Sequence, residues 1–190
     1  MSGRISLGII YGGVKSLANE LTNITNYLVE CKGQVVKVVF SRDSDGVYWV
    51  EDLHPNPNLD ADMLVTAFNT SISFTSIHLC GNQYSAEVRV YKRDGYFGIL
   101  IDFDDLIIYH GKTSLAEFEK VVANLLVNIY EASRYDYAFC DHEGEIEFPP
   151  LEFLSKEQEV YSMVALPDED GGAPRLKTSS WHIDGLTARK

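Results

Sequence analysis

Cysteine is scarce in this sequence of 190 residues, and its placement argues against two kinds of site. The three cysteines, Cys31, Cys80 and Cys140, are odd in number and widely separated, and each lies near an apolar run. This spacing fits neither a disulfide framework nor a zinc site. We therefore expect reduced thiols that pack as small apolar side chains, and a cytoplasmic location.

Long apolar runs are also missing. A helix that crosses a bilayer needs about 18 apolar residues in succession, and the sequence has no such run. The first apolar segment, Ile5–Tyr11, is short, and Gly12-Gly13 follows it in place of a small-residue cleavage site. We interpret the segment as a strand and not as a signal peptide, and we expect no association with membranes.

Basic residues are few relative to acidic ones. The sequence has 16 Lys and Arg against 28 Asp and Glu, a net charge of −12 that repels nucleic-acid phosphates. A nucleic-acid ligand is therefore not expected, and a basic protein or a cationic ligand fits better. The charge is also concentrated, because ten acidic residues and a single basic one, Lys156, lie between Asp141 and Asp170.

Patterns of nucleophilic catalysis are absent or weak. No Gly-x-Ser-x-Gly occurs, and Cys140 is the one cysteine with an activating neighbour, His142, two residues along. The apolar residues Tyr137–Phe139 favour a buried structural role for this thiol. Tyr11-Gly12-Gly13 could present N–H groups to an anion but lacks the Lys-Ser/Thr of a phosphate-binding loop, so a tight turn is favoured. We predict that the protein is not an enzyme.

One alternative is a small metal-dependent hydrolase that uses Asp102, Asp104, His142 and Glu143. Carboxylates can hold a hard cation, and a His–carboxylate set can transfer protons. The pattern is unspecific, because Asp-x-Asp is common and His-Glu here lacks the second His of a zinc-protease helix. We predict no metal site and no cofactor.

The remaining composition predicts a packed core, because 45% of the residues are hydrophobic and 12% are aromatic. Apolar periodicity predicts helices over residues 17–28, 60–69 and 115–132, and Ser114 and Glu117 have the spacing of a capping box. Alternation and turn signals, including Asp94-Gly95, predict strands at residues 5–11, 35–41, 47–50, 72–79, 84–92, 96–103, 135–140 and, as a final edge strand, 181–186.

These elements predict one α+β domain over residues 1–190. We expect a mainly antiparallel sheet packed in two layers against two long amphipathic helices. Residues 167–179, which include Asp168-Glu169-Asp170-Gly171-Gly172, are expected to form a flexible loop.

The most distinctive feature is a row of acidic residues at alternate positions, Asp141, Glu143, Glu145 and Glu147. In an extended segment all four carboxylates would project from one face. One interpretation is a docking stripe for Lys and Arg of a partner protein. The other is a solvated edge strand whose charges prevent aggregation. Both remain open from the residues alone.

Aromatic residues extend this candidate surface. Phe148 directly follows the acidic row, and Trp181 lies later in the chain. Aromatic anchors beside charges are typical of interface hot spots. Phe148 and Phe153 could instead pin the Pro149-Pro150 turn to the core. The predicted partner-binding residues are Asp141, Glu143, Glu145, Glu147, Phe148 and Trp181.

In the segments Tyr137-Ala138-Phe139-Cys140-Asp141-His142-Glu143-Gly144-Glu145-Ile146-Glu147 and Trp181-His182-Ile183-Asp184-Gly185-Leu186, the chain resembles the small cytoplasmic immunity proteins of bacterial polymorphic toxin systems. The resemblance is one of size, acidity and α+β layout. It implies a protein that binds a cognate toxin domain, often a basic one, and blocks its active site by occlusion without catalytic residues. A structural or oligomerisation domain, for example a homodimer, is the remaining alternative.

Overall fold

The computed structural model describes residues 3–53, 55, 59–110, 113–168 and 170–189. Its strands are β1 (Arg4–Gly12), β2 (Gln34–Ser41), β3 (Trp49–Asp52), β4 (Asn69–Leu79), β5 (Asn82–Arg93), β6 (Tyr96–Asp104), β7 (Tyr137–His142), β8 (Met163–Leu166) and β9 (Arg175–Thr178). Its helices are α1 (Leu17–Glu30), α2 (Ala61–Thr66), α3 (Leu106–Tyr109), α4 (Leu115–Ala132) and α5 (Pro150–Leu154). Residues 54 and 56–58 of the Pro-rich connection, and Glu169 of the predicted loop, lie outside the described part.

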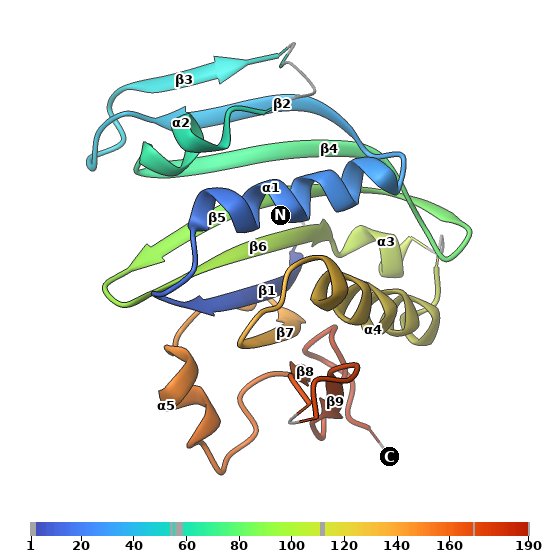
Figure 1. The fold of residues 1–190 in the computed structure, drawn as a ribbon. Coiled ribbons are helices and arrows are strands. Elements are labelled where there is room, and N and C mark those ends of the chain that lie inside the picture. Colours follow the sequence, from blue (N-terminus) through green and yellow to red (C-terminus); the bar gives the residue numbers. More distant parts are fainter. Residues whose placement is uncertain (1–2, 54, 56–58, 111–112, 169, 190) are drawn as a thin grey trace.

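The described strands form one nine-stranded sheet in the order β3-β2-β4-β5-β6-β1-β7-β8-β9 (Figure 1). Each neighbouring pair is antiparallel. The α+β class and the mainly antiparallel sheet are therefore confirmed. Because β1 lies between β6 and β7, the first strand of the chain joins its middle third to its last third.

Local sequence signals fix several ends of these elements. Ser114 accepts a hydrogen bond from the backbone N–H of Glu117 at 3.3 Å, and the Glu117 carboxylate accepts one from the N–H of Ser114 at 3.0 Å, which completes the predicted capping box. Gly95 has φ +81° in the tight turn between β5 and β6, as the Asp94-Gly95 signal predicts.

The main core lies between the sheet and the helices α1, α2 and α4, which all cover the same face (Figure 1). Alternate residues of β1, Ile5, Leu7 and Ile9, are fully buried there. The buried side of α4 includes Phe118, Val122, Leu125 and Ile129, and that of α1 includes Leu21, Ile24 and Leu28. Among the residues that the structure describes, α1 and α4 are the longest helices, with 14 and 18 residues.

A second, smaller apolar cluster lies on the opposite face, so the two-layer arrangement does not hold for the whole sheet. It contains Ile10, Leu100, Tyr137, Phe139, Ile146, Phe153 and Tyr161. Two aromatic pairs stack in it: Phe139 on Tyr161 with ring centroids 3.7 Å apart, and Tyr137 on Phe153 at 4.1 Å. The segment that carries the acidic row therefore packs as a third layer over β1, β6 and β7.

Two glycines in the strands permit this third layer. A Cβ atom at Gly8 would overlap the ring of Phe139, and one at Gly98 would overlap the side chain of Ile146. Glycine in a strand interior often marks such a close approach. The approach fixes how near the acidic segment lies to the sheet.

Several boundaries and one strand differ from prediction. The predicted edge strand 181–186 does not form; Trp181 and Ala188 make only an isolated bridge, and β9, inside the segment expected as a loop, is the edge strand. The short helix α2 ends at Thr66, and β4 already begins at Asn69, a residue predicted as helical. β7 runs from Tyr137 to His142, two residues later than predicted.

No helix in the described ranges is both long and apolar enough to cross a membrane.

Candidate functional site

Only Asp141 of the acidic row lies in a strand, β7, which is not an edge of the sheet, and Glu143, Glu145 and Glu147 follow outside any strand. β7 lies between β1 and β8, and the chain leaves it at Glu143, where φ is +51°. Beyond this point burial alternates: Glu143, Glu145 and Glu147 are exposed, whereas Gly144 and Ile146 are buried. The edge-strand interpretation is therefore wrong. Three of the four predicted carboxylates, those of Glu143, Glu145 and Glu147, are exposed to solvent, although the left-handed φ of Glu143 interrupts the extended geometry that was predicted.

Backbone hydrogen bonds hold this exposed segment in place. The N–H of Glu143 donates to the carbonyl of Arg4 at 2.7 Å, and the N–H of Arg4 donates to the Glu143 carboxylate at 2.9 Å. The Tyr161 hydroxyl donates to the carbonyl of Glu145 at 2.8 Å, and that of Tyr137 donates to the carbonyl of Phe148 at 2.7 Å. The backbone of the row is thus held against the fold, and the carboxylate of Glu143 is itself hydrogen bonded.

Asp141 does not belong to the exposed row. Its carboxylate is half-buried and accepts hydrogen bonds from the indole N–H of Trp181 at 3.2 Å and from the backbone N–H of Ser162 at 3.1 Å. Burial raises the pKa of Asp141, although these hydrogen bonds oppose the shift. Asp141 and Trp181, both predicted to contact a partner, therefore bond to each other.

Phe148 has features of both roles considered for it, an aromatic residue of the partner surface and an anchor of the following turn. It is half-buried against the second apolar cluster, and its carbonyl accepts the Tyr137 hydrogen bond. The ammonium of Lys156 lies 4.2 Å from the centre of its ring, in cation–π geometry. This places the one basic residue of the acidic segment over an aromatic ring.

The residues of the hydrolase alternative do not form one centre. Asp102 is buried in an ion pair with Arg89 and accepts from the Ser6 hydroxyl at 2.7 Å, while Asp104 accepts from the N–H of Leu106 at 2.9 Å. His142 instead lies 3.4 Å from Asp105. Within the described ranges, no group of three or more His, Cys, Asp or Glu is arranged to hold a metal ion.

The two other candidate motifs are engaged in the fold. Cys140 is fully buried in the main core, and burial raises the pKa of its thiol well above the ordinary value, which disfavours the thiolate. The N–H of Gly12 donates to Asp136 at 2.6 Å, and that of Gly13 donates to the carbonyl of Gly95 at 2.9 Å. These N–H groups have partners within the protein, as a tight turn requires.

A charge network beside the row was not anticipated from the sequence. Arg4 pairs with Glu87 at 3.5 Å and lies 3.8 Å from Asp102, which also pairs with Arg89. Burial opposes the charge of Arg89, but Asp102 outweighs it and raises the pKa, with Glu87 and Glu145 acting in the same direction. The acidic row therefore borders this network. In the sequence, this network corresponds to the alternate charged residues Glu87 and Arg89 of β5 and to Asp102 of β6.

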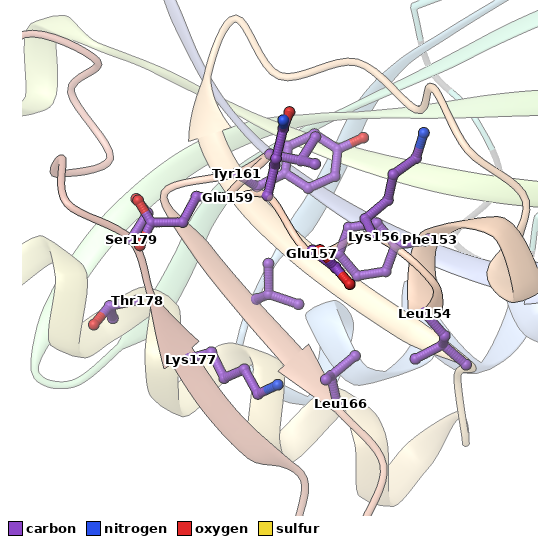
Figure 2. Close-up of a pocket in the computed structure, with 13 residues that line it drawn as sticks. Phe153, Leu154, Lys156, Glu157, Glu159, Tyr161, Leu166, Lys177, Thr178 and Ser179 are labelled. Atoms are coloured by element: carbon purple, nitrogen blue, oxygen red, sulfur yellow. The ribbon is translucent and has the colours of Figure 1, made fainter.

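A hollow of about 230 Å³ is lined by the later part of the acidic segment, between the chain after α5 and the strands β8 and β9 (Figure 2). Phe153, Tyr161 and Leu166 supply apolar surface, and Lys156, Glu157 and Lys177 supply charges of both signs. Glu159 is engaged in hydrogen bonds from Ser180, 3.0 Å from its N–H and 2.8 Å from its hydroxyl. The mixed charges of this hollow indicate no particular ligand.

The basic C-terminal end is tied to α4. Arg189 binds the Glu119 carboxylate with both terminal nitrogens, at 2.8 and 3.1 Å, and His182 Nδ1 lies 3.0 Å from the same carboxylate. Both members of the Arg189–Glu119 pair are largely buried. This contact positions the segment that carries Trp181 against Asp141.

Comparison with known proteins identifies the family. No curated protein matches the chain. Among solved structures, the Pseudomonas aeruginosa T6SS protein PA0821 is similar with a TM-score of 0.38 and 10% sequence identity. That similarity covers 74% of this chain and 41% of that chain, so this chain spans less than half of its length.

The sequence also matches the family described as Immunity protein 64 over residues 1–189. The predicted resemblance to immunity proteins is therefore confirmed, and the chain belongs to the Immunity protein 64 family.

Proposed function

We propose that this protein is a cytoplasmic immunity protein that binds its cognate toxin domain through the exposed carboxylates of Glu143, Glu145 and Glu147 and occludes the toxin's active site. Family membership implies a toxin protein as the partner. The proposal adds that the toxin surface is basic, as charge complementarity with the row requires.

The observation that carries the proposal is the exposed charge of Glu145 and Glu147 on a backbone that is held in place. In the described part of the chain, no Lys, Arg or His nitrogen lies within 4.0 Å of the Glu145 or Glu147 carboxylates. Their backbone is nevertheless held by Tyr161 and by burial of Ile146. Like charges held side by side repel each other, and a basic partner would relieve that repulsion.

Asp141, Trp181 and Phe148 complete the proposed surface in supporting roles. Asp141 and Trp181 position the end of β7, from which the row starts. Phe148 directly follows the row and provides its aromatic border, with the ammonium of Lys156 over its ring. We therefore expect their substitution to act through the placement of the row.

Charge reversal tests the proposal. The variant Glu145→Lys/Glu147→Lys is compared with Glu30→Lys/Glu131→Lys, which makes the same change at exposed residues of α1 and α4, the helices on the opposite face. Binding is measured by calorimetry with the toxin domain encoded by the neighbouring gene, inactivated at its catalytic residue. We expect at least a tenfold higher Kd for the first variant and a smaller change for the control.

The rate of association provides an independent reading. Attraction between an acidic row and a basic toxin speeds association at low salt, and added salt screens it. We expect the wild-type association rate to fall steeply with ionic strength and the reversed variant to lose most of this dependence. Equal Kd values for the two charge variants would remove the row from the interface. If the protein binds an active toxin without inhibiting it, the proposal that binding occludes the toxin's active site is wrong.

A further inference from the structure

One half of the sheet is open on the face away from the long helices. The second apolar cluster covers this face over β1, β6 and β7, but Ser71 and Ser73 of β4 and Glu87 of β5 remain half-exposed. An antiparallel sheet commonly leaves one face in water. What distinguishes this face is its shape and the chemistry of its two borders.

The open face is hollowed into a trough. A depression of about 600 Å³ extends from Trp49 in β3 across Lys37, Ser71 and Arg89 to Arg4 in β1. A second depression of about 380 Å³ shares Arg4, Ser73 and Glu87 with the first and continues it. Serines with small side chains form the floor along β4, which leaves room above the strand for side chains of another molecule.

One border of the trough is aromatic and rigid. Trp49 is 52% exposed, and Val47 and Tyr48 directly before it are 68% and 70% exposed. The indole N–H of Trp49 donates to the carbonyl of Gly46 at 2.7 Å, and the Asp43 carboxylate accepts from the N–H groups of Val47 and Tyr48 at 2.8 and 2.7 Å. Exposed aromatic side chains on a braced turn lose little freedom on binding, and Trp and Tyr are enriched in hot spots.

The other border is acidic. The backbone N–H of Arg4 donates to the Glu143 carboxylate, so the acidic row meets the trough at Arg4, the end away from Trp49. The charge of Glu145 also acts on Arg89, in agreement with this placement. The cations inside the trough already have acidic partners: Arg4 with Glu87, Arg89 with Asp102, and Lys37 with Glu51. A guest would therefore find paired charges on the floor and, beyond Glu143, the exposed carboxylates of Glu145 and Glu147 at this border.

We propose that the trough receives a protruding segment of the toxin domain, which places an apolar side chain against Trp49 and a basic side chain at Glu145. This inference rests on the proposed function and extends the contact surface from the row to the whole open face. The partner is thus a folded protein with an apolar and a basic group on one projection, separated by the width of the strands β2, β4 and β5.

Two variants test the trough with the same inactivated toxin domain as the probe. Ser73→Tyr fills the trough with a neutral side chain that suits a strand, and Trp49→Ala removes its aromatic border. The matched control is Thr178→Tyr on β9, an exposed strand residue at the opposite edge of the sheet. We expect at least a tenfold higher Kd for Ser73→Tyr and for Trp49→Ala, and wild-type affinity for Thr178→Tyr.

The outcomes separate this inference from the proposed function. If Ser73→Tyr and Trp49→Ala bind as wild type while Glu145→Lys/Glu147→Lys binds weakly, the trough is not occupied and the proposed function stands. If wild-type protein does not bind the toxin domain, both proposals fail. Thermal unfolding of each variant shows whether its fold survives, and Trp49→Ala, at an exposed edge position, keeps the test decisive if Ser73→Tyr does not fold.

Discussion

The indole N–H of Trp181 donates a hydrogen bond to the carboxylate of Asp141 across 40 residues of sequence, at 3.2 Å. The contact fastens the C-terminal segment to the strand that precedes the acidic row. The backbone carbonyl of Trp181 also accepts a hydrogen bond from the Ser162 hydroxyl at 2.9 Å. The placement of the row therefore depends on segments from both ends of the chain, since Arg4 binds it as well.

Replacing Gly98 by alanine should destabilise the fold and displace the acidic segment. A Cβ atom there would overlap the side chain of Ile146, which lies between Glu145 and Glu147. Overpacking of this kind costs about 1–3 kcal/mol. Urea unfolding measures the loss.

The control for this prediction is Gly12→Ala, where a Cβ would meet its nearest neighbour, the Asp136 carboxylate, at 3.4 Å. We expect a smaller change there. Equal losses at the two positions would show that the close approach of Ile146 is not the cause.

Removing the Arg189 side chain should leave the largely buried carboxylate of Glu119 without its bidentate partner. Loss of one member of such a pair costs about 3–5 kcal/mol, because the remaining charge stays desolvated. Arg189→Ala should therefore lower the free energy of unfolding by about that amount, measured with urea.

Adding Glu119→Gln to Arg189→Ala should recover part of the loss, since no uncompensated charge remains. Lys156→Ala, which breaks the more exposed pair with Glu152, serves as the comparison and should cost less than about 1 kcal/mol. A double variant less stable than the single one would argue against this account.

The hairpin that carries Trp49 should loosen in acid. Hydrogen bonds from the N–H groups of Val47 and Tyr48 lower the pKa of the Asp43 carboxyl. The unfolded chain therefore binds this proton more readily than the folded protein. The stabilising contribution is complete above the ordinary Asp pKa of about 3.9 and is lost as the pH falls through the lower folded value.

Amide NMR signals of Val47 and Tyr48 should report this titration with a midpoint below 3.9, the ordinary value. The variant Asp43→Asn should abolish it, whereas Asp45→Asn, in the same turn, should leave it intact. A midpoint at or above the ordinary value would contradict the bracing role of Asp43.

Much of the fold could be predicted because local patterns coincide with it. The alternation of Phe97, Ile99, Ile101 and Phe103 marks one buried face of β6, and Asp94-Gly95 marks its turn. The stripe of Phe118, Val122, Leu125 and Ile129 marks the buried side of α4. These signals depend only on residues near one another in sequence.

The candidate site was predicted less completely, for reasons that lie in long-range contacts. The sequence around Asp141 gives no sign that its carboxylate accepts a hydrogen bond from Trp181. The sequence around Asp102 gives no sign of its ion pair with Arg89. The second apolar cluster was missed because its members come from six separate parts of the chain, each too short to show a period. Val47-Tyr48-Trp49, three apolar residues after a polar turn, was a signal that could have drawn attention to the aromatic border.

The sequence by itself determined that the acidic charge is concentrated after residue 140. It also determined that Glu143, Glu145 and Glu147 alternate with the buried residues Gly144 and Ile146, because alternation is a local property. Only the tertiary structure decided what that segment borders. The central position of β1, the glycines at 8 and 98 and the contacts of Trp181 with Asp141 bring it against the sheet face instead of a sheet edge. Burial of apolar surface between distant segments drives that packing, and it cannot be read from neighbouring residues.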